Sequence, residues 1–225
     1  MDKLEYFKQT EHALKNLFST YEYYVELAKS TIHPVICIRH SGRAAEAEEM
    51  YAEWRNRPEV DAEFKKSEIA WDNYRTLLFS KNVISGSILQ IASKSIEIYS
   101  KNTLSENNKL AYLDKIDKRK WEKYAIGRAI KDVPIGLIIY SGRNQYNHFN
   151  DCDLRNSVNI AVFKQLAYID GETSDPAFSL DSENIKCLSS NILYLLGWCS
   201  YADYISDMAE MHDFSVGDLN YLKNG

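Results

Sequence analysis

Apolar residues recur at the spacing of an α-helix along almost the whole chain, and this periodicity limits the folds open to it. The first stripe, which predicts a helix from about Leu4 to about Ala28, consists of Leu4, Phe7, Leu14, Phe18, Tyr21 and Val25. A chain of 225 residues with only 9 Gly and 4 Pro has few of the turns that an all-β fold needs. The sequence therefore predicts an all-α protein, a helical bundle of roughly six or seven helices.

The first half of the chain contains two more predicted helices. Ala44–Arg55 is a polar, acidic helix with few core residues, and the connection before it contains a strand-like run, Val35–Ile38. A further helix begins near Ser67, kinks at Ser80–Asn82 and continues through Ile96 in the same rhythm.

Local start signals precede the predicted helices of the second half. These signals are Ser105, the pair Asp132 and Pro134, and the pair Asp151 and Asp153. The apolar residues that follow them are Leu110, Leu113 and Ile116, then Ile135–Tyr140, then Leu154, Val158, Val162 and Leu166. A last long helix runs from about Ile185 to Met208. We expect an N-terminal helical extension, residues 1–65, and a bundle, residues 66–225, unless the two form one continuous domain.

Composition and charge point to an ordinary soluble protein. Hydrophobic residues make up 45% and charged residues 26% of the chain, and the net charge of −5 means that any RNA must be held by a local basic surface. Neither a signal peptide nor a run long enough to span a bilayer is apparent. We expect a cytoplasmic protein whose cysteines are reduced and mostly buried, namely Cys37, Cys152, Cys187 and Cys199.

The segment Arg143–His148 (RNQYNH) combines side chains that suit phosphodiester chemistry. Arginine holds phosphate oxygens through a rigid fork of donors, and histidine can take or give a proton near neutral pH. On a helix Asn144 and His148 are neighbours, so the carboxamide can orient the imidazole. Arg143 and His148 diverge by about 140°. They meet on one phosphate only if the helix bends, if the arginine wraps around it, or if a second protomer completes the site.

The order of Arg143, the polar Asn144, three further residues and His148 resembles the motif of the HEPN superfamily, a family of helical bundles that includes ribonucleases and toxins. The apolar lead-in Val133–Gly142 and the earlier Ile84–Ile98 also look like the packing helices of such proteins. The resemblance covers residues 67 to 211, whereas residues 1–65 match no known pattern.

This resemblance implies an endoribonuclease that needs no metal and no cofactor. His148 would remove the proton of a ribose 2′-OH, Arg143 would stabilise the charge on the phosphate, and Asn144 would assist. The products would be a 2′,3′-cyclic phosphate and a 5′-hydroxyl. The family also implies a homodimer, a role in a toxin–antitoxin, abortive-infection or related defence system, and a neutralising antitoxin or activating partner protein.

Two other interpretations stay open. The chain can be a non-catalytic HEPN module that dimerises and binds a nucleotide or a partner protein, or an unrelated helical interaction protein in which the motif is accidental. The remaining histidines, which show no metal-ligand spacing, are expected to be structural or solvated; they are His12, His33, His40 and His212.

A basic stretch precedes the motif and is a candidate RNA-binding surface. Residues 115–131 hold seven basic residues against Asp117 and Glu122, with Trp121 and Tyr124 between them. A solvated helix face with both aromatic residues in the core is the alternative. Tyr146 can stack on a base or pack inside the protein, and Asp151 can orient the imidazole or cap the next helix. The candidate RNA-binding residues are Lys118, Arg119, Lys120, Lys123, Arg128, Tyr146 and Asn147.

Overall fold

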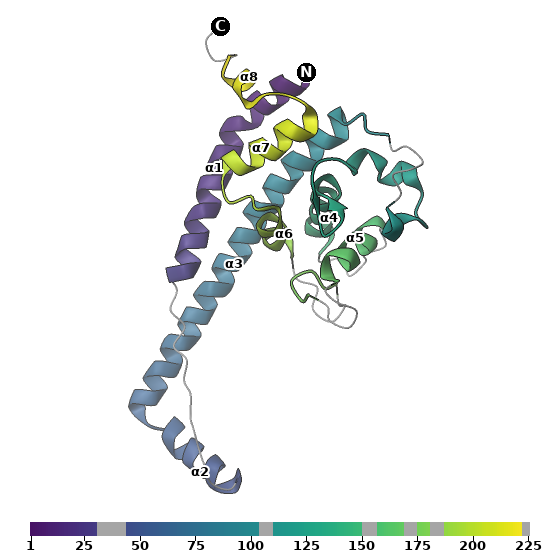
Figure 1. The fold of residues 1–225 in the computed structure, drawn as a ribbon. Helices are drawn as coiled ribbons and strands as arrows, with labels where there is room; N and C mark the ends of the chain where they lie inside the picture. The colour runs from purple at the N-terminus through teal and green to yellow at the C-terminus, as the bar shows by residue number, and fades with distance from the viewer. Residues whose placement is uncertain (31–43, 104–109, 150–156, 169–174, 181–186, 222–225) are drawn as a thin grey trace. The chain divides into compact units, whose positions relative to one another are not determined.

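The computed structural model describes residues 1–30, 44–103, 110–149, 157–168, 175–180 and 187–221. The α-helices in these residues are α1 (Lys3–Ser30), α2 (Ala44–Arg55), α3 (Pro58–Tyr99), α4 (Ile135–His148), α5 (Ser157–Ala167), α6 (Ser189–Leu196), α7 (Tyr201–His212) and α8 (Val216–Tyr221) (Figure 1). Three short 3-10 helices, η1 (Ala111–Leu113), η2 (Lys118–Lys120) and η3 (Glu122–Tyr124), precede a hairpin of β1 (Ala129–Ile130) and β2 (Val133–Pro134). The predicted all-α class is confirmed.

The chain divides into two compact units. The larger unit consists of Met1–Glu22 and Lys81–Gly225, and the smaller unit is Tyr23–Ser80. This division differs from the expected boundary at residue 65, because the first part of α1 belongs to the larger unit. Phe7 and Phe18 are buried there, and the Phe18 ring lies 5.7 Å from the ring of Tyr204 on α7.

Helix α4 lies at the centre of the larger unit, where it contacts α5 and α6 (Figure 1). Ile135, Leu137, Ile138 and Ile139 are all buried, so its first two turns are apolar on every side. A helix that is apolar all round must lie inside the protein, because no face of it is suited to water. The start signal at Pro134 is confirmed, since Pro134 occupies the N-cap of this helix.

A hairpin that the sequence analysis missed leads into α4. Ala129 pairs with Pro134 and Ile130 with Val133 in an antiparallel register. The two turn residues, Lys131 and Asp132, have φ angles of 50° and 62°. A two-residue turn with positive φ at both positions matches the right-handed twist of the strands, and Asp is among the residues that tolerate this conformation.

The smaller unit contains α2 and the first part of α3. The ring of Trp54 lies 5.8 Å from that of Phe64, and Arg55 lies over Phe64 at 3.9 Å and forms an ion pair with Asp61 at 3.1 Å. Helix α2 has the predicted bounds. Helix α3 begins at Pro58 instead of Ser67, and the kink expected at Ser80–Asn82 does not interrupt it. The run Val35–Ile38 lies outside the described residues.

Two predicted helices of the larger unit are broken into shorter elements. In the described residues, the predicted helix with Leu110, Leu113 and Ile116 is the short 3-10 helix η1. It is followed by η2, which the Asp117 side chain caps by accepting a hydrogen bond from the backbone N–H of Arg119. The predicted last helix is two helices. Gly197, at φ 72°, ends α6, and a capping box between Ser200 and Asp203 begins α7.

Some sequence-based expectations concern residues outside the described part of the chain, namely the caps Ser105, Asp151 and Asp153, and Cys37, Cys152, His33 and His40. The apolar face of α5 is confirmed for Val158, Val162 and Leu166. Of the two cysteines in the described residues, Cys187 is half-buried and Cys199 is exposed, so burial is not confirmed for either. None of the described helices has the length and hydrophobicity needed to cross a bilayer.

His212, at the end of α7, is a buried structural histidine. Its side chain is 6% exposed, its Nε2 lies 3.1 Å from the Ser95 hydroxyl, and its ring contacts those of Phe7 and Tyr99. Burial, with a smaller contribution from the charge of Lys3, lowers the pKa of His212 to about 4. The folded protein therefore holds His212 in its neutral form.

We expect acid to destabilise the larger unit through His212. The unfolded chain takes up the proton below the ordinary pKa of about 6.5, whereas the folded chain resists it down to about 4, so stability falls as the pH drops through this window, by about 3 kcal/mol in total. Urea unfolding of the wild type and of His212→Gln at pH 7 and pH 5 measures this loss. The variant should lose less stability than the wild type. An equal loss in both, or an effect as large in the exposed-site control His12→Gln, would contradict the assignment.

Candidate functional site

Arg143 projects from α4 toward α3, where two neutral carboxamides hold it. Its Nε donates to Oε1 of Gln90 at 2.6 Å, and its Nη1 donates to Oδ1 of Asn144 at 2.9 Å. The guanidinium is half-buried, and its second terminal nitrogen, Nη2, has no hydrogen-bond partner in the part of the chain that the structure describes. Arg143 is thus oriented by its neighbours, while the Nη2 group and the planar face of the guanidinium stay available to a ligand.

The partners of Arg143 distinguish it from other arginines of this chain. Four described arginines have a carboxylate within ion-pair distance; these are Arg55, Arg75, Arg119 and Arg128. Gln90 and Asn144 carry no charge, so they fix the guanidinium without cancelling its charge. A pre-oriented guanidinium that pairs with no carboxylate among the described residues is suited to bind an anion such as a phosphate.

Asn144 supports Arg143 rather than His148. The Asn144 side chain is 8% exposed, its Oδ1 accepts from Arg143, and its Nδ2 donates to Oδ1 of Asn159 on α5 at 3.3 Å. The expected hydrogen bond from Asn144 to the imidazole is therefore replaced by a buried chain of polar contacts. The reason is that Asn144 lies on the face of α4 that packs against the core, whereas His148 lies at the exposed end of the helix.

Gln90 on α3 forms hydrogen bonds with two side chains of α4. While its Oε1 accepts from Arg143, its Nε2 donates to Oδ1 of the exposed Asn147 at 3.3 Å. Tyr146 packs against Gly86 on α3, where an added Cβ would lie 2.3 Å from the Tyr146 ring. Packing, rather than an open stacking position, is therefore the role that the structure gives to Tyr146. The missing side chain at Gly86 lets α3 and α4 come close enough for Gln90 to reach both partners.

His148 is the last residue of α4, and its side chain is exposed. The helix is regular from Ile135 to His148, and Arg143 is held toward α3 by Gln90. The two side chains are five residues apart, so on a regular helix they leave its axis about 140° apart.

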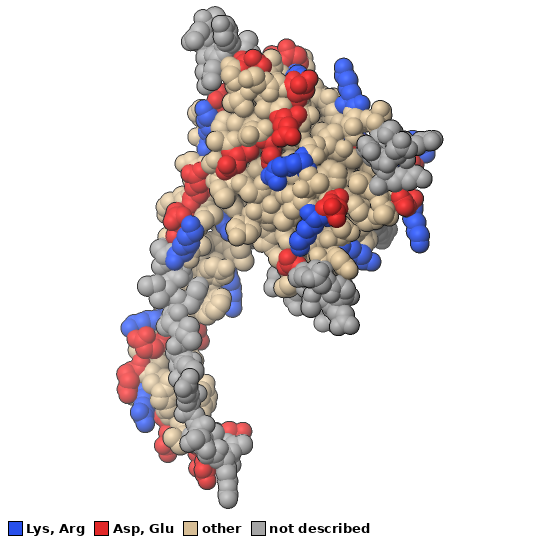
Figure 2. All heavy atoms as spheres, in the orientation of Figure 1, with Lys and Arg blue, Asp and Glu red and all other residues tan. Residues whose placement is uncertain are grey.

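The basic stretch, residues 115–131, contacts α4 through an aromatic residue. Tyr124 of η3 stacks on Tyr140 of α4 with ring centroids 4.2 Å apart, one turn before Arg143. Trp121 and Tyr124 are buried, as the alternative reading of this segment expected. Arg119 is paired with Asp117 at 2.8 Å and Lys118 with Glu122 at 3.7 Å, which reduces the net charge of the stretch. On the face that Figure 2 shows, basic and acidic side chains are interspersed.

The last three basic candidates differ in role. Lys120 is exposed, and Lys123 Nζ donates to the carbonyl oxygen of Glu97 on α3 at 3.3 Å. Arg128 forms a two-pronged ion pair with Asp207 at 2.9 Å for both contacts, and its Nη2 also donates to the Leu196 carbonyl. The bond to Asp207 raises the pKa of Arg128. These bonds join the residue before the hairpin to α6 and α7, and the expectation that Arg128 binds RNA stays a prediction.

The sequence analysis missed Gln90 and Asn159, which complete the polar cluster around Arg143. They lie 53 residues before and 15 residues after their partners. Neither spacing is a motif, and only the packing of α3 and α5 against α4 brings these carboxamides to the site. Among the described residues no group of three or more His, Cys, Asp and Glu side chains could hold a metal ion.

Comparison of the chain with family models, with curated proteins and with solved structures gives no match in any of the three.

Proposed function

We propose that the chain is a metal-independent endoribonuclease of the HEPN type, with Arg143 and His148 as its catalytic residues. The observation that carries the proposal is the guanidinium of Arg143, which Gln90 and Asn144 orient without neutralising. An exposed imidazole on the same helix, five residues later, supplies a group that can transfer protons. Asn144 acts in this proposal as a positioning residue for Arg143.

The reaction would proceed by attack from within the RNA. His148 removes the proton of the 2′-OH, and the resulting oxyanion forms a bond to the adjacent phosphorus. The bond from phosphorus to the 5′-oxygen breaks, and this oxygen leaves with a proton as a 5′-hydroxyl. Arg143 stabilises the negative charge that builds on the non-bridging oxygens. The other product carries a 2′,3′-cyclic phosphate.

The active form would be a homodimer. Because α4 turns Arg143 and His148 about 140° apart and Gln90 holds the arginine toward α3, a facing copy of the chain supplies the missing partner for each. Asn147, exposed beside this site, and the basic residues Lys118, Arg119, Lys120 and Lys123 would contact the RNA backbone. An active cytoplasmic ribonuclease needs restraint, so an antitoxin or an activating partner in a defence system would control it.

The test of this proposal is RNA cleavage in EDTA. We expect the purified protein to cut RNA but not DNA of the same sequence, because DNA lacks the attacking 2′-OH. End analysis should find 2′,3′-cyclic phosphates and 5′-hydroxyls. Cleavage of both nucleic acids, a strict need for a divalent metal, or 5′-phosphate ends would each refute the mechanism. Absence of cleavage together with tight nucleotide or partner-protein binding that survives Arg143→Ala would favour the non-catalytic module.

Gln90 offers a sharper test of the charge argument. Gln90→Leu removes the hydrogen bond to Arg143 and should lower kcat roughly tenfold, because the guanidinium then occupies its catalytic position for less of the time. Gln90→Glu keeps the acceptor but brings a carboxylate to the guanidinium, so it should also raise KM for RNA and make binding less sensitive to salt. The exposed Gln9→Leu on α1 is the matched control. If Gln90→Glu is as active as the wild type, the uncompensated charge of Arg143 is not what matters.

A further inference from the structure

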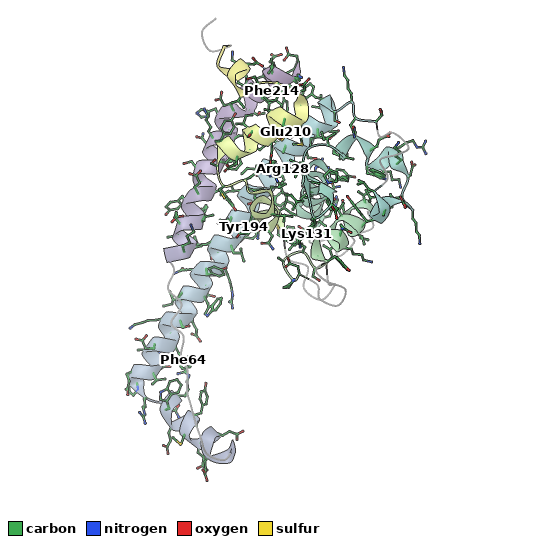
Figure 3. The ribbon with its side chains drawn as sticks, in the orientation of Figure 1. Phe64, Arg128, Lys131, Tyr194, Glu210 and Phe214 are labelled. Atoms are coloured by element: carbon green, nitrogen blue, oxygen red, sulfur yellow. The ribbon has the colours of Figure 1, made fainter. Side chains whose placement is uncertain are left out.

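An open groove in the larger unit is lined by residues that the proposed nuclease site does not use. Its volume is about 430 Å³, which is within the range of roughly 300–1,000 Å³ typical of small-molecule sites. Residues from the start of the larger unit's part of α3, from the hairpin turn, from the segment after α5 and from α6 line it. Figure 3 labels two of these residues, Lys131 from the turn and Tyr194 from α6.

The charges in this groove do not cancel. Lys131 donates to the Leu166 carbonyl at 2.6 Å and lies 3.7 Å from the Asp175 carboxylate, so this pair is nearly neutral. Lys81 has no carboxylate within ion-pair distance among the described residues, and its Nζ lies over the ring of Tyr21 at 5.7 Å. Partial burial of the Lys81 ammonium group lowers its pKa. An anion in the groove would compensate this desolvated charge.

Ser190 contributes a hydroxyl to the groove. The residue is 3% exposed, and its backbone N–H donates to Oδ1 of Asn82 at 3.1 Å. Its hydroxyl has no hydrogen-bond partner in the described residues, although it lines the groove. The hydroxyl is therefore available to a ligand in the groove. A ligand that accepts a hydrogen bond would satisfy it.

Aromatic surface completes the groove. Tyr194 is 80% exposed, far more than a tyrosine that serves packing, and Phe178 lies beside Lys131 with the ammonium 5.7 Å from its ring. The exposed ring of Tyr194 can stack on a flat ligand ring. The groove thus combines one uncompensated cation, one free hydroxyl donor and one exposed aromatic face.

We propose that this groove, with Lys81, Ser190 and Tyr194, binds a small aromatic anion, that is, a phosphate or carboxylate attached to a flat ring. Lys81 and Ser190 hold the anionic group, and Tyr194 stacks on the ring. The inference does not depend on the ribonuclease proposal, since none of these residues contacts Arg143 or His148 in the residues described.

Calorimetric titration of the full chain with AMP and with benzoate distinguishes the two kinds of anion. At least one of them should bind, and adenosine and inorganic phosphate should each bind more weakly, because each lacks one half of the recognised chemistry. Lys81→Met, which keeps the apolar stem, and Ser190→Ala should each weaken binding roughly tenfold. Tyr194→Ala, at an exposed position that does not endanger folding, should weaken it about fivefold or more.

Lys94→Met on the exposed side of α3 is the matched lysine control and should leave binding unchanged. Failure of both anions to bind at millimolar concentration, binding that is insensitive to Lys81→Met and Tyr194→Ala, or adenosine binding as tight as AMP would overturn the inference. Binding that is lost in Arg143→Ala but kept in Lys81→Met would place the ligand at the nuclease site. That outcome would refute the groove while the ribonuclease proposal stands.

Discussion

Replacement of Asp207 by alanine should lower the free energy of unfolding of the larger unit by about 3 kcal/mol or more. The Asp207 side chain is buried, and its carboxylate accepts two hydrogen bonds from Arg128 and one from the indole N–H of Trp198 at 2.7 Å. The Trp198 side chain has no exposed surface, so its N–H would be left without an acceptor and without water. Arg128, which is 42% exposed, can recover part of its hydration.

Chemical denaturation of the variants tests this ranking. Arg128→Ala should cost less than Asp207→Ala, because the carboxylate then keeps the Trp198 donor. Trp198→Phe should fall between them, because it removes one donor and keeps most of the packing. The exposed Asp72→Ala, which breaks an ion pair on the surface of α3, is the control and should change stability little. An unfolding midpoint of Asp207→Ala equal to that of the wild type would show that the network does not hold the hairpin to α6 and α7.

Loss of the catalytic side chains should have the largest effect on activity. We expect His148→Ala to reduce the rate of RNA cleavage by about 10²–10⁴-fold, the usual contribution of a positioned general base. Arg143→Ala should reduce it by about 10²–10³-fold, because the charge on the phosphate is then stabilised by fewer donors. His12→Ala and Arg75→Ala, both at exposed positions, are the controls. Unchanged cleavage by both catalytic variants would remove the assignment of Arg143 and His148.

The same two variants test whether the site is shared between subunits. If Arg143 of one protomer acts with His148 of the other, co-refolding of inactive Arg143→Ala with inactive His148→Ala should restore activity. About half of the dimers would then be mixed and would contain one intact pair. Sites complete within one chain would give no recovery, and a monomer at assay concentration would contradict the shared site directly.

Local signals in the sequence were sufficient for several of the helices. The stripe in α1, the bounds of α2, the N-cap at Pro134 and the apolar face of α5 were all predictable, because each depends on residues within a few turns of one another. The break between α6 and α7 was equally local, since Gly197 and the pair Ser200 and Asp203 are recognised end and start signals. The long apolar periodicity across this region concealed them.

The surroundings of Arg143 depended on distant parts of the chain. Its place five residues before His148 and its helical setting follow from the sequence, because periodicity and spacing are properties of neighbouring residues. Its partner Gln90 and the role of Asn144 follow only from the packing of α3 and α5 on α4. The ion pair between Arg128 and Asp207 likewise joins residues 79 positions apart. Hydrogen bonds between distant segments depend on how helices pack, and packing is decided by the whole core rather than by any single stretch of residues.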